Sequence, residues 1–210
     1  KYSFINFKKV GVAVYADKIE NIEDINNKIS HYPDFIHIDI VDKTMKKNAN
    51  DIDIFCLETI KSYWPKTQIQ THIMSTKPSK WVSKVLPFSD VVYVHGDINK
   101  DLRQVIDEIR NMGKLVGIAL KSSSEIKNYI NVLQKADYVL LLTIENPGNS
   151  GQNFQSSAFK KIDQLNSLPF RNRFILCVDG GVNTSISKLI NSECIVSASS
   201  ILKNSNPIKQ

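Results

Sequence analysis

Short apolar runs alternate with stretches in which hydrophobic residues recur at helical spacing, and this alternation continues along the chain. The apolar runs have the length and composition of buried strands. They cover residues 10–15, 35–41, 67–74, 91–95, 114–120, 138–143, 173–178 and 194–197. The amphipathic stretches between them predict helices at 18–30, 52–63, 79–86, 99–111, 122–135, 154–165 and 184–191.

Strands that alternate with helices are typical of a parallel sheet, and eight repeats are enough to close a (β/α)8 TIM barrel. We therefore expect an α/β protein in which residues 1–210 form a single TIM-barrel domain. The helix after the last strand is predicted to be short or missing. The first residue is Lys1 rather than an initiator methionine, so the domain is also consistent with a piece of a longer protein.

Composition and charge narrow the classes of partner. The net charge is +6, but the basic residues are scattered, whereas nucleic-acid sites usually show a clustered basic patch. A mildly positive surface suits an anionic small molecule instead. No apolar run approaches the ~20 residues of a membrane helix, so we expect no membrane partner. Cys56, Cys177 and Cys194 lie far apart in apolar settings, which predicts reduced, buried thiols in a cytoplasmic protein.

The second apolar run carries polar groups toward its end. His37 and Asp39 are two residues apart, and this spacing puts both side chains on one face of a strand. A histidine beside a carboxylate can ligate a divalent metal or perform acid–base chemistry. A hydrogen-bonded His–Asp pair that only stabilises a loop is the alternative for this stretch taken alone.

Other polar candidates follow the ends of later strands. His72 and Met74 end the third strand, His95 ends the fourth, and Asp179 ends the seventh. In a TIM barrel the active groups lie at the carboxyl ends of the strands. These residues are therefore predicted to meet at one mouth, with His95 in a supporting rather than a ligating role.

Five ordered motifs resemble the ribulose-phosphate 3-epimerase family over residues 10–202. Residues 37–42 are similar to its His-x-Asp-x-Met-Asp segment, and residues 71–74 to its His-Leu-Met segment. The loop 146–154 resembles Asn-Pro-Gly-Phe-Gly-Gly-Gln-x-Phe. Residues 178–181 match Val-Asp-Gly-Gly, and residues 196–201 resemble Val-x-Gly-Ser-x-Ile.

The resemblance implies an isomerase that inverts the carbon next to the ketone of a ketose phosphate. By this resemblance, His37, Asp39, His72 and Asp179 would hold one divalent metal. Asp39 and Asp179 would also act as the acid–base pair, through an enediolate. Imidazole ligands favour zinc, iron, cobalt or manganese over magnesium and calcium. The resemblance also implies a homo-oligomer.

The sugar phosphate would lie against the later loops, where main-chain N–H groups bind phosphate in many barrels. Plain turn geometry is the alternative explanation for the glycines. The residues assigned to substrate and phosphate are Met74, Gly148, Gly151, Gln152, Gly180, Gly181, Ala198, Ser199 and Ser200.

The chain departs from the family pattern mainly at positions expected to face substrate. Val12 and Tyr15 replace a Ser-x-x-Ser pair, and Val41 and Thr143 replace methionines. The loop 43–48 stands where the family has Gly-x-Phe-Val-Pro-Asn and keeps only the last residue, and Asn149 and Ser150 replace a Phe-Gly pair. These changes suggest retained chemistry with an altered substrate.

Two other functions stay open from the sequence. The first is a metal-independent barrel aldolase or decarboxylase. Such enzymes carry an Asp-x-Lys pattern at the second strand, which the adjacent Asp42 and Lys43 match poorly. The second is a non-catalytic phosphosugar-binding module, which would explain the lost serines and methionines.

Overall fold

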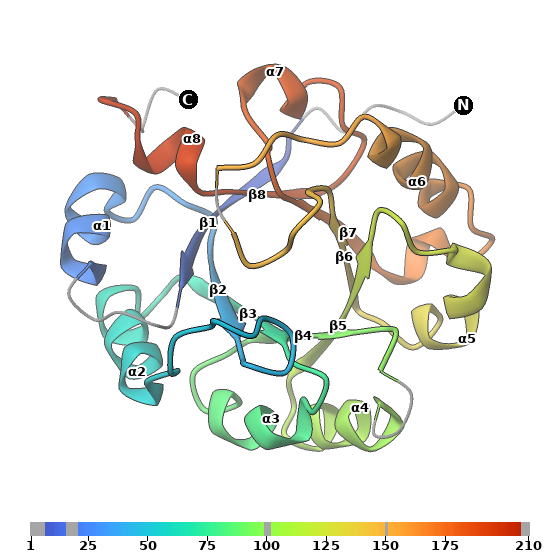
Figure 1. Ribbon diagram of the computed structural model, residues 1–210, viewed down its shortest axis with the longest axis horizontal. Helices are drawn as coiled ribbons and strands as arrows, with labels where there is room; N and C mark the ends of the chain where they lie inside the picture. Colours follow the sequence, from blue (N-terminus) through green and yellow to red (C-terminus); the bar gives the residue numbers. More distant parts are fainter. Residues whose placement is uncertain (1–6, 16–20, 99–101, 150, 207–210) are drawn as a thin grey trace.

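The structure is a computed structural model that describes residues 7–15, 21–98, 102–149 and 151–206. Eight parallel strands close into a barrel in the order β1 to β8, with β1 paired to β8 (Figure 1). The strands are β1 Lys9–Tyr15, β2 Phe35–Val41, β3 Gln68–Met74, β4 Val91–His95, β5 Leu115–Lys121, β6 Tyr138–Leu142, β7 Ile175–Asp179 and β8 Cys194–Ser197. The predicted TIM barrel is confirmed.

Helices surround this barrel on the outside (Figure 1). The helices are α1 Ile22–Ile29, α2 Ile54–Tyr63, α3 Ser79–Val85, α4 Leu102–Asn111, α5 Ile130–Leu133, α6 Ser157–Asn166, α7 Thr184–Ser187 and α8 Ser199–Leu202. The last helix is short, as predicted. Within the described residues, no helix is both long enough and apolar enough to span a membrane.

Two packed layers follow from the alternation of side chains along the strands. Ile36, Ile38 and Ile40 point outward into the layer between sheet and helices. Phe35 belongs to a second cluster inside the barrel, together with Tyr93. The buried strands therefore need hydrophobic residues on both faces, which explains their nearly continuous apolar runs.

Some predicted helices are shorter in the structure. The stretch 122–135 contains the 3-10 helix Ile126–Tyr129 and α5 rather than one helix. The Ser124 hydroxyl accepts a hydrogen bond from the N–H of Lys121, and this bond closes a turn between β5 and the 3-10 helix. The stretch 184–191 is helical only through Ser187. The three cysteines are buried and form no disulfide, in agreement with the predicted thiols.

Candidate metal and epimerase site

The two central strands of the site position their side chains by simple alternation. His37 and Asp39 point into the barrel between outward-facing isoleucines, and both side chains are buried. In the register of the sheet, Asp39 is the partner of His72 on β3. Asp179 enters from the end of β7, which is not a neighbour of β2. Residues ~140 positions apart are thus brought together because parallel strands end at the same side of the barrel.

His37, Asp39, His72 and Asp179 each offer one ligand atom, and these atoms all lie within 4.8 Å of one another. His72 Nδ1 lies 3.3 Å from Asp39 Oδ1, and His37 Nε2 lies 3.5 Å from the same oxygen. Neither ring nitrogen of His37 has a hydrogen-bond partner among the described residues, although the ring is fully buried. Because buried polar atoms are rarely left unpaired, this orphaned imidazole fits a metal ligand. The cluster can therefore accommodate a metal ion.

The two carboxyl groups differ electrostatically. Burial and the nearby charge of Asp39 raise the pKa of Asp179 to about 7, against a smaller opposing effect of His37. Burial also acts to raise the pKa of Asp39, but the adjacent imidazoles of His37 and His72 outweigh it and lower the pKa below its ordinary value. Without a metal, Asp39 is therefore ionised at neutral pH, while Asp179 titrates near neutrality.

The pKa values of the two candidate ligand histidines are also shifted in opposite directions. Burial opposes protonation of His37, but the carboxylates of Asp39 and Asp179 outweigh it and raise the pKa. For His72, burial dominates over the attraction of Asp39 and lowers the pKa. A neutral His72 is the form that can donate a lone pair to a metal.

His95 supports His72 rather than joining the cluster. Its Nε2 lies 3.0 Å from Nε2 of His72, and the two rings stack with centroids 5.0 Å apart. Burial lowers the pKa of His95 well below its ordinary value, which favours a neutral ring that can exchange a hydrogen bond with His72. Because Nε2 of His72 is engaged with His95, its Nδ1 is left toward Asp39.

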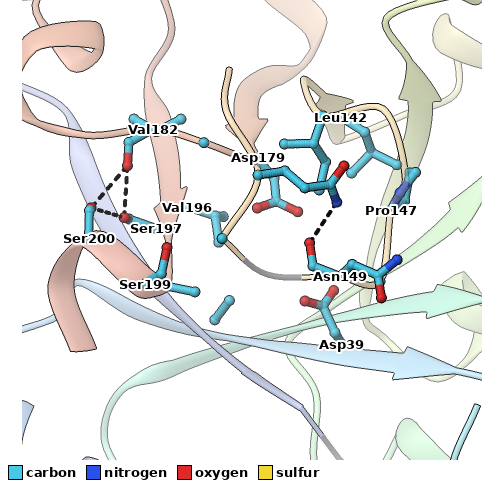
Figure 2. A pocket seen from close by; sticks show the side chains of 18 of the residues that line it. Asp39, Leu142, Pro147, Asn149, Asp179, Val182, Val196, Ser197, Ser199 and Ser200 are labelled. Atoms are coloured by element: carbon cyan, nitrogen blue, oxygen red, sulfur yellow. Dashed lines mark hydrogen bonds between the residues drawn. The ribbon is translucent and has the colours of Figure 1, made fainter. Parts of the chain in front are cut away.

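A cavity of about 300 Å³ opens above the cluster. Figure 2 shows the carboxylates of Asp39 and Asp179 pointing into this space from different sides. The histidines lie beneath it, fully buried. All nine residues assigned to substrate and phosphate line the cavity: Met74, Gly148, Gly151, Gln152, Gly180, Gly181, Ala198, Ser199 and Ser200.

The loops after β7 and β8 are held close together at one end of the cavity. The hydroxyl groups of Ser197 and Ser200 donate to the carbonyl of Val182 at 2.9 and 3.1 Å and lie 2.7 Å apart (Figure 2). Gly181 has φ +67°, and a Cβ there would lie 2.3 Å from the N atom of Phe154. Any side chain at position 181 would therefore push the loop after β7 away from the segment that follows β6.

Sequence reasoning missed some of the lining residues. Lys203, which follows α8, lines the cavity, and so does Asn183. These residues carry no recognisable motif, but Lys203 stands just beyond the Val-x-Gly-Ser-x-Ile segment, where a cation near the expected phosphate could have been noticed.

The residues that replace the family's serines and methionines do not all face the cavity. Tyr15 lines it, and Val41 lines a small extension beside it. The expectation is wrong for Val12, which packs in the layer beneath the helices, because strand alternation turns Ala13 inward instead. Thr143 is fully buried, and its hydroxyl donates to the main-chain carbonyls of Asp179 and Gly180. Thr143 thus supports the end of β7 instead of facing the cavity.

Asp42 and Lys43 are engaged away from the cavity. Asp42 is buried and accepts hydrogen bonds from Ser75 at 2.6 Å and from the indole of Trp81 at 2.8 Å. Lys43 pairs with Asp51 at the surface, where the lysine side chain is 60% exposed. This pair therefore does not supply an aldolase-type Asp–Lys site.

Solved structures share the fold at low sequence identity. The 3-hexulose-6-phosphate synthase from Salmonella typhimurium superposes with a TM-score of 0.70 at 16% identity, over 96% of this chain and 93% of that chain. A mutant of the tryptophan synthase α-subunit from Pyrococcus furiosus gives a TM-score of 0.71 at 11% identity, over 93% and 89%. At these identities the likeness concerns the fold alone.

Sequence comparison is more specific. The ribulose-phosphate 3-epimerase of Schizosaccharomyces pombe is 23% identical over 180 residues, which cover 83% of this chain and 77% of that protein. The ribulose-phosphate 3-epimerase of Buchnera aphidicola subsp. Baizongia pistaciae is 30% identical over 168 residues, or 78% and 73%. A model of the ribulose-phosphate 3 epimerase family matches residues 10–202. The chain therefore belongs to the ribulose-phosphate 3-epimerase family, a family of carbohydrate epimerases in the isomerase class.

Proposed function

We propose that this protein inverts the carbon next to the ketone of ribulose 5-phosphate or of a related pentulose, hexulose or heptulose phosphate. One observation carries the proposal: the carboxylates of Asp39 and Asp179 face one cavity from non-adjacent strands, above two buried histidines. Membership of an epimerase family supports the same reaction class.

Inversion requires a proton to leave one face of a carbon and another to arrive on the opposite face. A single carboxylate would return the proton to the face from which it came. Asp39 and Asp179 enter from β2 and β7, so a flat enediolate between them would have one carboxyl group on each side. One aspartate takes the proton as general base and the other delivers a proton as general acid, and the roles exchange in the reverse direction.

His37, Asp39, His72 and Asp179 would hold one divalent zinc, iron, cobalt or manganese ion. When bound, the metal would supply Lewis-acid stabilisation of the negative charge that develops as the proton leaves. The buried ring of His37 supports this assignment, because neither of its nitrogens has a hydrogen-bond partner among the described residues and the atom 3.5 Å from Nε2 is Oδ1 of Asp39, itself a proposed ligand. His95 would orient His72 through the contact between their Nε2 atoms.

The phosphate would lie at the end of the cavity formed by Gly180, Gly181, Ala198, Ser199 and Ser200. The Ser200 hydroxyl is already bonded to Val182, so main-chain N–H groups are the expected ligands there. The ammonium group of Lys203 would add a positive charge beside them. The homo-oligomeric state and the cytoplasmic location stay predictions.

Proton exchange in heavy water tests the proposal. Metal-loaded protein is incubated with ketopentose, ketohexose and ketoheptose phosphates, and deuterium entry at the carbon beside the ketone is followed. Exchange with one substrate is the expected result, and the D179N variant should lose formation of the inverted product. Exchange that survives exhaustive chelation would favour metal-independent chemistry, and phosphate binding without metal or exchange would favour a binding module.

A further inference from the structure

Lys46 connects two loops that follow strands on opposite sides of the barrel. Its ammonium group donates to the carbonyl oxygen of Gly148 at 3.2 Å and to the side-chain oxygen of Asn149 at 2.7 Å. Lys46 follows β2, whereas its two partners follow β6. In the closed ring, β2 and β6 are separated by three strands in either direction, so this contact spans the mouth. Figure 1 shows the segment after β6 reaching over the middle of the ring.

The contact holds the loop beside the proposed reaction centre. A Cβ at Gly148 would lie 3.2 Å from a methyl carbon of Val41 and 3.7 Å from the sulfur of Met74, so the loop rests on the ends of β2 and β3. Gly148 has φ +85°, a conformation that favours glycine. Gly148 and Asp39 line both the main cavity and the small extension that Lys46 also lines. Lys46 therefore acts where substrate would meet Asp39.

Gln152 braces the described part of the loop after β6 by hydrogen bonds that do not involve Lys46. The side-chain amide of Gln152 donates to the carbonyl oxygens of Asn146 at 2.7 Å and Asn149 at 2.8 Å. The Gln152 side-chain oxygen also accepts from the N–H of Asn146 at 3.1 Å. What the two hydrogen bonds of Lys46 add is the placement of this braced loop relative to β2.

Both side chains of the contact depart from the family pattern described above. Lys46 stands at the position of the valine in Gly-x-Phe-Val-Pro-Asn, and Asn149 stands at the position of the phenylalanine in the later loop. The two polar replacements are 103 residues apart in sequence and form a hydrogen bond. One contact thus accounts for two departures that look unrelated in the sequence.

From this geometry we infer that Lys46 is a positioning residue, which holds the loop after β6 over Asp39 before substrate arrives. The inference rests on the proposed function. A loop that is already in place need not be ordered by substrate. Without the contact, only a fraction of the free protein would have the binding-competent arrangement, and the apparent affinity would fall by that fraction. The expected change is therefore in KM rather than in kcat.

The test compares K46M with K47M, which removes the same charge from the neighbouring exposed lysine. We expect K46M to raise KM about tenfold with kcat changed less than about twofold. K46R should restore KM to within about threefold, because a guanidinium group can donate to both acceptors. K47M should leave both constants unchanged. A folding defect would instead lower the active fraction, and with it the apparent kcat.

An independent measurement separates this inference from the proposed function. Amide hydrogen exchange of peptides covering residues 144–153 is measured without substrate, and we expect it to be about fivefold faster in K46M than in wild type and in K47M. Unchanged KM together with unchanged exchange in K46M would overturn the inference. Equal KM increases in K46M and K47M would also overturn it, because they would indicate general attraction of an anionic substrate. If wild type turns over no ketose phosphate, the proposed function fails, and the exchange comparison alone decides the role of the contact.

Discussion

At the amino ends of the strands, four acidic side chains accept hydrogen bonds from main-chain N–H groups, whereas at the carboxyl ends two aspartates face a cavity. Each of the four stands immediately before an even-numbered strand and bonds to the odd-numbered strand before it. The pairs are Asp34 with Val10, Asp90 with Ile69, Asp137 with Val116, and Glu193 with Leu176, at 2.8, 2.8, 2.8 and 2.9 Å. This repeated arrangement ties strand pairs together.

Asp39 and Asp179 have a different environment. Their neighbours are the imidazoles of His37 and His72 and each other, and burial with mutual repulsion raises the pKa of Asp179 to about 7. The same residue type therefore stabilises the barrel at one end and, as proposed, performs chemistry at the other. The difference lies in the partners, which are main-chain N–H groups for the four acids and imidazoles and a second carboxyl group for Asp39 and Asp179. In TIM barrels, residues at the amino ends of the strands generally serve stability and those at the carboxyl ends serve catalysis.

Replacing Asp179, at the carboxyl end of the barrel, should lower activity strongly while leaving the fold intact. We expect D179N to lower kcat by about 10³-fold or more, because the amide cannot transfer the proton. The fold should persist, since the variant removes a partly buried charge without opening a cavity. The measurement is conversion of the ketose phosphate to its epimer, with circular dichroism as a check of folding. Full activity in D179N would rule out the two-aspartate mechanism.

The reverse result is expected at the amino end. D137A should lower the free energy of unfolding by about 2 kcal/mol, because it leaves the main-chain N–H of Val116 without its carboxylate partner. Turnover should stay within about twofold of wild type. Urea denaturation measures the effect, with D163A as a control at an exposed aspartate on α6. An activity loss in D137A that exceeds its loss of folded protein would contradict the division between the ends.

Metal affinity should depend on pH through Asp179. Its pKa is raised to about 7, so below that pH a proton occupies the carboxylate and competes with the metal. Affinity should therefore fall as pH falls, by about tenfold between about pH 7.5 and about pH 6. Titration calorimetry at several pH values measures this. D179N should bind metal more weakly and with a shallower pH dependence. If metal affinity fell equally steeply with pH in wild type and in D179N, the competing proton would belong to the histidines instead.

The sequence was sufficient for the barrel because two periodicities, one for strands and one for helices, recur with little interruption. The convergence of His37, His72 and Asp179 also followed, since every parallel strand ends at the same side. The sequence could not predict that the side chain of Ala13 rather than that of Val12 points into the barrel, because the strand is apolar on both faces at these positions. The contact of Lys46 with Asn149 could not be read either, because it joins loops far apart in sequence whose conformations no periodicity specifies.

Asp42 lies at the carboxyl end of β2, yet its hydrogen-bonded carboxylate resembles those of the acids at the amino ends. It accepts hydrogen bonds from the N–H and hydroxyl of Thr44, from Ser75 and from Trp81. Burial acts to raise its pKa, but these donors outweigh it and lower the pKa. If the partners of a carboxylate rather than its location distinguish structural from catalytic carboxylates, Asp42 is structural. W81F should then lower the free energy of unfolding by about 1 kcal/mol, through loss of one hydrogen bond, without changing kcat. Guanidinium denaturation and turnover measured on the same preparations decide this. A loss of kcat at unchanged stability would show that position along the strand matters more than the partners of the carboxylate.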